Sequence, residues 1–156
     1  MKHPLTLKLE NYLNQNNISY KEVNHTAAAT CQESAGARGE ELKIGGKTVL
    51  FKSKFGFSLF VISAAKEIDS TMVRKILRSP KLRFATTEEF QRITGTKIGA
   101  LPPFGVPIFE LSIYLDQSIK ENTKIAFNAG VLTKSFILQM NDYLKLVPNE
   151  FYDFSK

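Results

Sequence analysis

The sequence predicts an α+β fold, with one domain in which helices surround a mixed, mostly antiparallel sheet. Segments of helical periodicity and segments of strand character follow one another in irregular order along the chain. Two hydrophobic segments near the middle are joined by a short turn, which predicts an antiparallel hairpin. The chain has 156 residues, 43% of them hydrophobic, and has no stretch composed like a linker. Residues 1–156 are therefore expected to form a single domain.

The first part of the chain predicts two helices with a strand between them. Apolar residues three or four positions apart predict an amphipathic helix over residues 5–13, which should stop at the asparagine cluster at 14–17. Alternating residues predict a short strand over 18–23. Small residues then favour a helix over 27–38, and Gly39 is well placed to end it.

The hairpin and a capped helix follow. Strands are expected at 48–51 and 57–63, with a turn at 52–56 between them. Asp69 can cap a helix that runs through Leu77, because its carboxylate accepts backbone N–H groups two or three positions further on.

The second half of the chain is predicted from the same kinds of signal. Thr86 and Glu89 have the spacing of a capping box, which predicts a short helix through Ile93. The stretch 94–107 holds three glycines and three prolines and is long for a connection without a function. The remaining expected elements are strands at 113–115, 124–128 and 135–140, and a final helix capped by Asn141 or Asp142 that ends at Val147.

The composition narrows the chemistry that the chain can perform. Its 21 Lys and Arg residues against 15 Asp and Glu residues give a net charge of +6, which favours a polyanionic partner. One cysteine and two histidines exclude an intramolecular disulfide and zinc sites of four cysteines or of two cysteines and two histidines. No segment approaches the roughly 20 apolar residues of a membrane span, so we expect a cytoplasmic protein without a membrane partner.

Three glycine-containing loops, at 45–47, 94–105 and 127–130, can expose backbone N–H groups to an anion, although each alone also fits an ordinary turn. Lys47 stands where the first loop meets a strand. If its side chain points inward, its ammonium must meet a carboxylate, a carbonyl or an anionic ligand, and otherwise it is a solvent-facing lysine. Cys31 is either a nucleophile or a packing residue of a small-residue helix.

Five positive charges and no negative ones lie between positions 74 and 83. Arg74 and Arg78 are spaced by one helical turn, so with Lys75 and Lys81 they can present a basic edge to a phosphate backbone. The alternative is a solvated helix face.

Together these features resemble the YbaK/ProX superfamily, the free-standing relatives of the editing domain inserted in bacterial prolyl-tRNA synthetases. The resemblance covers nearly the whole chain. It is carried by His25 and Thr30, GKTVLF at 46–51, VISAAKEID at 61–69, VRKIL at 73–77, RFA at 83–85, the loop 94–105 and FNAG at 127–130.

The resemblance implies hydrolysis of the ester that joins an amino acid to the 3′ end of a mischarged tRNA, without a metal or organic cofactor. It implies a catalytic role for Lys47, near the terminal adenosine and the reacting ester. It also implies that the loop 99–103 forms the amino-acid pocket and that the turn 128–130 lines the opposite wall. The residues expected at the substrate are Thr30, Cys31, Gly99, Ala100, Pro102, Pro103, Asn128, Ala129, Gly130 and Ser135, and those expected at the tRNA are Arg74, Lys75, Arg78 and Lys81.

The amino acid stays open among alanine, serine, threonine and cysteine, although polar groups at the pocket favour serine or threonine. Two rival functions also stay open. One is a non-catalytic tRNA-binding or synthetase-associated module of the same fold. The other is a hydrolase of a small ester or nucleotide-linked molecule, for which the basic segment would be incidental.

Overall fold

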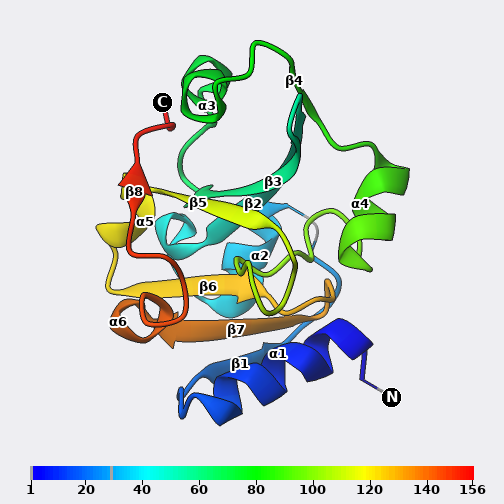
Figure 1. The fold of residues 1–156 in the computed structure, drawn as a ribbon. Coiled ribbons are helices and arrows are strands. Elements are labelled where there is room, and N and C mark those ends of the chain that lie inside the picture. Colours follow the sequence, from blue (N-terminus) through cyan, green and yellow to red (C-terminus); the bar gives the residue numbers. More distant parts are fainter. Residues whose placement is uncertain (1, 29) are drawn as a thin grey trace.

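The computed structural model describes residues 2–28 and 30–156, whose strands form two sheets (Figure 1). The three-stranded sheet has the order β1-β7-β6 and is antiparallel throughout. The five-stranded sheet has the order β4-β2-β3-β5-β8, with β5 parallel to both of its neighbours and the other pairs antiparallel. The strands are β1 (Lys21–Asn24), β2 (Gly46–Ser53), β3 (Gly56–Ser63), β4 (Leu82–Phe84), β5 (Ser112–Asp116), β6 (Lys124–Asn128), β7 (Lys134–Gln139) and β8 (Phe151–Tyr152). The α+β class is confirmed, and the expected single sheet is divided in two.

The helices surround the two sheets. They are α1 (Pro4–Gln15), α2 (Cys31–Arg38), α3 (Ser70–Leu77), α4 (Thr87–Thr94), α5 (Gln117–Lys120), α6 (Met140–Tyr143) and the 3₁₀ turn η1 (Leu42–Ile44). Figure 1 shows α3 above the five-stranded sheet and α1 beneath β7, at opposite ends of the molecule. Within the described residues, none of these helices combines the length and the apolar character needed to cross a membrane.

The hydrophobic core lies on both faces of the five-stranded sheet. Leu50 packs into the main cluster, which also contains Phe127 and Phe136 of the three-stranded sheet. The next residue, Phe51, belongs to a second cluster with Val73 of α3. Neighbouring strand residues point to opposite faces, so β2 is covered by side chains on both sides and its path is fixed.

Several predicted helix ends are confirmed by their hydrogen bonds. The Asp69 carboxylate accepts the backbone N–H of Thr71 at 3.1 Å, and α3 follows it. Thr86 and Glu89 form both halves of the predicted capping box. Gly39 ends α2 in the left-handed conformation, with φ of +69°.

Other predicted helix boundaries are wrong. The second helix begins at Cys31 rather than at 27, because Thr30 caps it by accepting the Glu33 N–H at 3.1 Å. The last helix is the single turn α6, preceded by Gln139 rather than capped by Asn141 or Asp142.

The short elements were missed, and the bounds of several strands differ from the prediction. The early strand occupies 21–24 instead of 18–23, and the hairpin strands extend until only residues 54 and 55 form the turn. The missed elements are β4, α5, β8 and the 3₁₀ turn η1, which have two to four residues each. The stability of segments this short comes from contacts with the rest of the fold, and their local sequence gives little indication of those contacts.

Candidate active site

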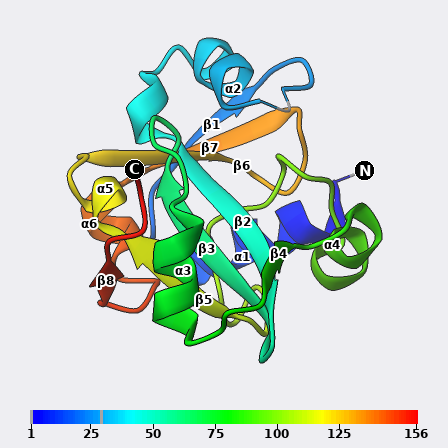
Figure 2. The same ribbon diagram turned by 90° about the horizontal axis from the view of Figure 1, so that it is seen from above.

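A cavity of about 360 Å³ lies beside the first half of β2. Its walls come from α2, from the start of β2, from the end of β4 with α4, from residues 98–101 and from β6. Figure 2 shows α2 and α4 lying around β2. The lining combines apolar side chains such as Leu101 and Ala126 with a few polar ones, an arrangement typical of ligand sites.

Five residues predicted from the sequence meet in this cavity, namely Thr30, Cys31, Lys47, Gly99 and Asn128. They come from four separate parts of the chain: α2 with the residue before it, β2, the loop after α4, and β6. The fold therefore gathers the lysine, one glycine loop and the asparagine that the sequence analysis singled out.

Lys47 is half-buried at the start of β2. Its Nζ donates to the carbonyl oxygen of Lys66 at 3.5 Å, a long contact on the exposed side of the molecule. Neither of the two expected environments holds fully, because the side chain lines the cavity and also reaches solvent. Its ammonium is thus available to a ligand, which would have to displace only this long contact with the Lys66 carbonyl.

The edge of β2 beside the cavity is open. β4 pairs only with residues 51–53 of β2, and the Leu50 carbonyl accepts the N–H of Ala85 at 3.0 Å. Backbone groups alternate in direction along a strand, so the N–H and C=O of Thr48 point to the same outer side as those of Leu50. Thr48 lines the cavity. The backbone N–H of Thr48 therefore points into the cavity, at the position next to Lys47.

The opposite wall carries a network of polar side chains around Asn128. Asn128 and Ser135 are directly paired across β6 and β7, and the Ser135 hydroxyl lies 3.0 Å from Asn128 Oδ1. Arg38 Nε donates to Ser135 Oγ at 2.8 Å, and Nε2 of His25 lies 2.9 Å from the same oxygen. Burial lowers the pKa of the Arg38 guanidinium from its usual range to about 10. The group therefore stays charged at neutral pH.

Six other predicted substrate residues are not brought to the cavity wall. They are Ala100, Pro102, Pro103, Ala129, Gly130 and Ser135, all buried. Their backbone groups are used inside the fold instead.

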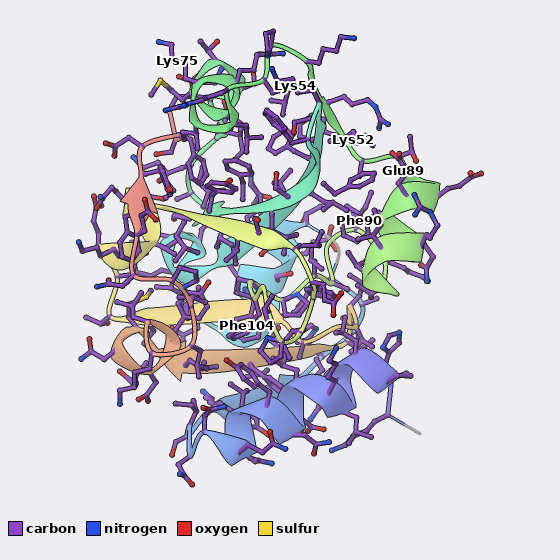
Figure 3. The ribbon with its side chains drawn as sticks, in the orientation of Figure 1. Lys52, Lys54, Lys75, Glu89, Phe90 and Phe104 are labelled. Carbon is purple, nitrogen blue, oxygen red and sulfur yellow. The ribbon has the colours of Figure 1, made fainter. Side chains whose placement is uncertain are left out.

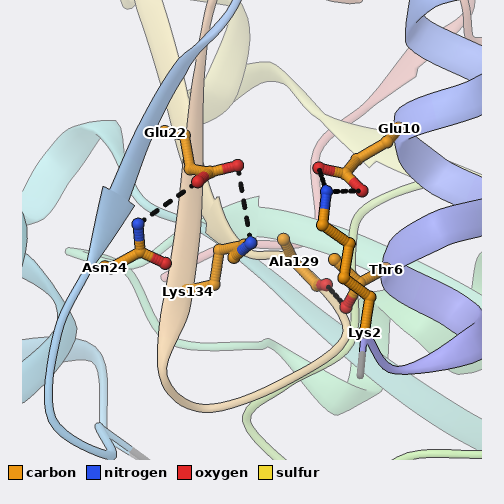
Figure 4. Close-up of polar contacts among 7 residues, drawn as sticks. All are labelled: Lys2, Thr6, Glu10, Glu22, Asn24, Ala129 and Lys134. Carbon is orange, nitrogen blue, oxygen red and sulfur yellow. Dashed lines mark hydrogen bonds and ion pairs between the residues drawn. The ribbon is translucent and has the colours of Figure 1, made fainter.

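Two hydrogen bonds illustrate this buried role. The Ala129 carbonyl accepts the Thr6 hydroxyl at 2.6 Å (Figure 4), and the Pro103 carbonyl accepts the Tyr143 hydroxyl at 2.7 Å. These residues support the wall from behind.

The predicted tRNA residues Arg74, Lys75, Arg78 and Lys81 lie on α3 and the segment after it, outside the cavity lining. Arg78 is the residue that ends α3, with φ of +53°, and its backbone N–H donates to the carbonyl of Arg74 one turn earlier, so the basic edge of these two arginines stays a prediction. Figure 3 shows Lys75 at the top of the molecule, the same end as Lys54. The positive charge is therefore spread over one end of the fold.

The fifth charge of the basic segment is neutralised. Arg83 forms a two-pronged ion pair with Glu89, with N–O distances of 2.7 and 3.0 Å. This pair, with the backbone N–H of Thr86, lowers the pKa of the Glu89 carboxyl from 4.5 to about 2.

Sequence reasoning missed three residues of the cavity. Arg38 looked like an ordinary basic residue in the last turn of a helix, where it complements the helix dipole. Phe84 and Ile98 were not singled out within the segments 83–85 and 94–105, yet they are 66% and 57% exposed and line the cavity. No local signal distinguishes such residues, because contacts between distant segments create their roles.

Comparisons with known proteins agree with this geometry. The family model described as the aminoacyl-tRNA editing domain matches residues 25–146. The chain is 30% identical over 149 residues to the multifunctional Ser/Thr-tRNA deacylase ProXp-y of Escherichia coli K12, covering 92% of this chain and 89% of that protein. It is also 30% identical over 74 residues to the proline–tRNA ligase of Caldicellulosiruptor saccharolyticus, covering 47% of this chain and 12% of the ligase.

A solved structure shares the fold. The crystal structure of a putative trans-editing enzyme for prolyl tRNA synthetase superposes with a TM-score of 0.84 at 24% identity, covering 100% of this chain and 99% of that one. The family model alone matches well over half of the chain. The chain therefore belongs to the aminoacyl-tRNA editing domain family and is an aminoacyl-tRNA hydrolase.

Proposed function

We propose that the chain acts in trans on mischarged tRNA and hydrolyses the ester of a small amino acid, with serine and threonine preferred among alanine, serine, threonine and cysteine. The observation that carries this proposal is the convergence of Lys47, the open edge of β2 at Thr48 and the polar network of Asn128 on one cavity. The name of the Escherichia coli relative, a Ser/Thr-tRNA deacylase, supports the same substrates.

The mechanism follows from where negative charge develops. Attack of water on the ester carbonyl moves negative charge onto the carbonyl oxygen. The outward N–H of Thr48 is a preorganised donor for that oxygen, and the ammonium of Lys47 adds to the positive field. Both interactions strengthen as the charge forms, which is the requirement for catalysis.

The attacking water needs a proton acceptor. His25 already contacts the Thr26 carbonyl through Nδ1 and Ser135 through Nε2, so both of its ring nitrogens are engaged. We therefore assign this role to the free ribose hydroxyl next to the ester, which would orient the water, accept its proton and pass its own proton to the departing ribose oxygen as the C–O bond breaks.

The tRNA is expected to approach from the end of the molecule that carries Arg74, Lys75, Arg78 and Lys81. Lys75, Arg78 and Lys81 are exposed. Arg74 is partly engaged, since its Nε donates to the Pro80 carbonyl at 3.2 Å. Neutralising Arg74, Arg78 and Lys81 together should weaken tRNA binding and flatten its salt dependence, because fewer counterions are released. Neutralising Lys21, Lys120 and Lys145 together is the matched control, because these exposed lysines lie in other parts of the fold, and an unchanged salt slope in the first variant would place the tRNA elsewhere.

We further propose that residues 1–156 work as one editing domain in the cytoplasm, with or without a synthetase partner. The N-terminal helix α1 lies outside the family match, yet Thr6 is bonded to Ala129, directly after β6. Removing α1 should therefore disturb the cavity wall.

The deciding experiment incubates the pure chain with seryl-, threonyl-, alanyl- and cysteinyl-tRNA and follows loss of the ester. We expect Lys47→Ala to lower kcat/KM by about 100-fold or more, as for loss of one group that stabilises a developing oxyanion. Lys145→Ala is the control, because Lys145 pairs only with Asp142 on the surface of α6. Unchanged turnover by Lys47→Ala would refute the role of Lys47. Binding of tRNA without release from any substrate would favour the non-catalytic module.

A further inference from the structure

The cavity contains a half-buried positive charge, that of Arg38, which the proposed mechanism does not use. Arg38 is the last residue of α2, and its side chain crosses to the three-stranded sheet and lines the cavity. The guanidinium is removed from water to a large extent, which costs free energy unless the group is paired or bound.

Neutral groups hold Arg38 in place. Nε donates to Ser135 Oγ at 2.8 Å, and Nη2 makes a longer contact of 3.4 Å to Asn128 Oδ1. The orientation of the Asn128 amide is fixed, because its Nδ2 donates to the carbonyls of Ala28 and Gly99, both at 2.9 Å. The two strands therefore present a rigid pair of oxygen acceptors to one edge of the guanidinium.

The opposite edge of the guanidinium is directed toward the start of β2. Nη1 of Arg38 lies 3.7 Å from the position that a Cβ on Gly45 would occupy. Among the residues that the structure describes, no acceptor bonds Nη1 and no carboxylate forms an ion pair with Arg38. The carboxylate of Glu40 is instead paired with Lys124 at 3.2 Å.

A purely structural role does not require this arrangement. Replacing a buried charge by a neutral side chain of similar volume is often neutral or stabilising, so an unpaired guanidinium is costly unless it has a further use. Its remaining N–H donors suit an oxygen acceptor from a ligand. The same cavity is lined by Cys31 and Ser34 of α2 and by Ala126 of β6. The space beside Arg38 is therefore bounded by small side chains.

We propose that Arg38 donates a hydrogen bond to the side-chain oxygen of the substrate's amino acid and so selects hydroxyl-bearing acyl groups over alanyl. Ser135 and Asn128 act as positioning residues that hold the guanidinium. Because this rests on the proposed deacylase function, its test measures binding separately from turnover.

The probes are non-hydrolysable adenosines that carry seryl, alanyl or aspartyl groups through a 3′-amide. Wild-type protein should bind the seryl analogue more tightly than the alanyl one. Arg38→Met should reduce this preference by about tenfold or more, the effect of losing one hydrogen bond to a charged donor. Arg92→Met is the matched control, because Arg92 is an exposed arginine on α4.

Two further variants separate selection from folding. Arg38→Lys keeps the charge but loses the two-pronged geometry, so it should fold and should retain only part of the preference. Ser135→Ala keeps the guanidinium but removes the hydroxyl that accepts from its Nε. The ratio of seryl to alanyl affinity should therefore fall, while urea denaturation should show that the variant is still folded in buffer.

The outcomes distinguish this inference from the deacylase proposal. Preferential seryl binding that depends on Arg38, with no turnover of any aminoacyl-tRNA, would support the role of Arg38 and reject the deacylase. Turnover together with equal seryl and alanyl affinities in the wild type would overturn the role of Arg38 alone. So would an equal loss of affinity for both analogues in Arg38→Met, or tighter binding of the aspartyl analogue than of the seryl one.

Discussion

Gly130 offers a sharp test of which glycines serve the fold. The backbone at Gly130 has φ of +84°, and a Cβ there would lie 3.0 Å from Leu5 Cγ and 3.2 Å from the Thr6 backbone nitrogen. Gly95 has a similar φ of +75°, but nothing lies within 4 Å of a Cβ at that position. The two glycines therefore share a backbone conformation and differ in the space available.

The expected magnitudes follow from that difference. Gly95→Ala should lose only the conformational term, about 1 to 2 kcal/mol for an L-residue in the left-handed region. Gly130→Ala carries the same term plus overpacking against α1, which adds about 1 to 3 kcal/mol. We expect Gly130→Ala to lower the free energy of unfolding by about 2 to 5 kcal/mol.

Urea denaturation followed by circular dichroism measures both variants, with the m-value as a check that unfolding stays two-state. Equal losses of stability would refute the reasoning, because they would mean that the contact with α1 relaxes without cost. Gly130 does not line the cavity, so the deacylation rate per folded molecule should be retained in Gly130→Ala. A large loss of the deacylation rate in fully folded Gly130→Ala protein would instead support the predicted role of Gly130 in substrate binding.

Three other substitutions test separate parts of the structure. The pKa of Glu89 is lowered from 4.5 to about 2 by its pair with Arg83, so its contribution to stability is present above pH 4.5 and is lost as the pH falls toward 2. Urea titrations across that window should show a shallower decline for Glu89→Gln. Tyr143→Phe leaves the buried Pro103 carbonyl without its donor, and the unfolding free energy should fall by about 1 to 3 kcal/mol without a change in m-value. Phe84→Ala removes an exposed ring at the cavity, so KM for aminoacyl-tRNA should rise by about tenfold with kcat retained if a base stacks there.

Much of the fold is encoded in local patterns. The strand at 124–128 was predicted with its observed bounds, because a short apolar run between turn signals leaves little choice. The caps at Asp69 and Thr86 were equally predictable, since each depends on residues within three positions. The remaining features of the fold depend on contacts between segments that are far apart in the sequence. The division into two sheets depends on which strand pairs with which, and no single segment records that.

The candidate site was only partly predictable for the same reason. Lys47 and Asn128 stood out because a lysine beside glycines and a strand-borne asparagine are chemically conspicuous. Arg38 was missed because its role depends on Ser135, which lies 97 positions away in sequence. Loop residues such as Pro103 were expected at the substrate, but their backbone groups are consumed by contacts such as the bond from Tyr143.

The network around Ser135 also has a consequence for proton positions. The Thr26 carbonyl can only accept, so Nδ1 of His25 at 2.8 Å must carry a hydrogen. The Ser135 hydroxyl has a single hydrogen, and both His25 Nε2 and Asn128 Oδ1 lie within bonding distance of its oxygen. In the neutral imidazole the two acceptors compete for that hydrogen. The orientation of one hydroxyl group thus links His25 to the Asn128 oxygen that accepts from Arg38.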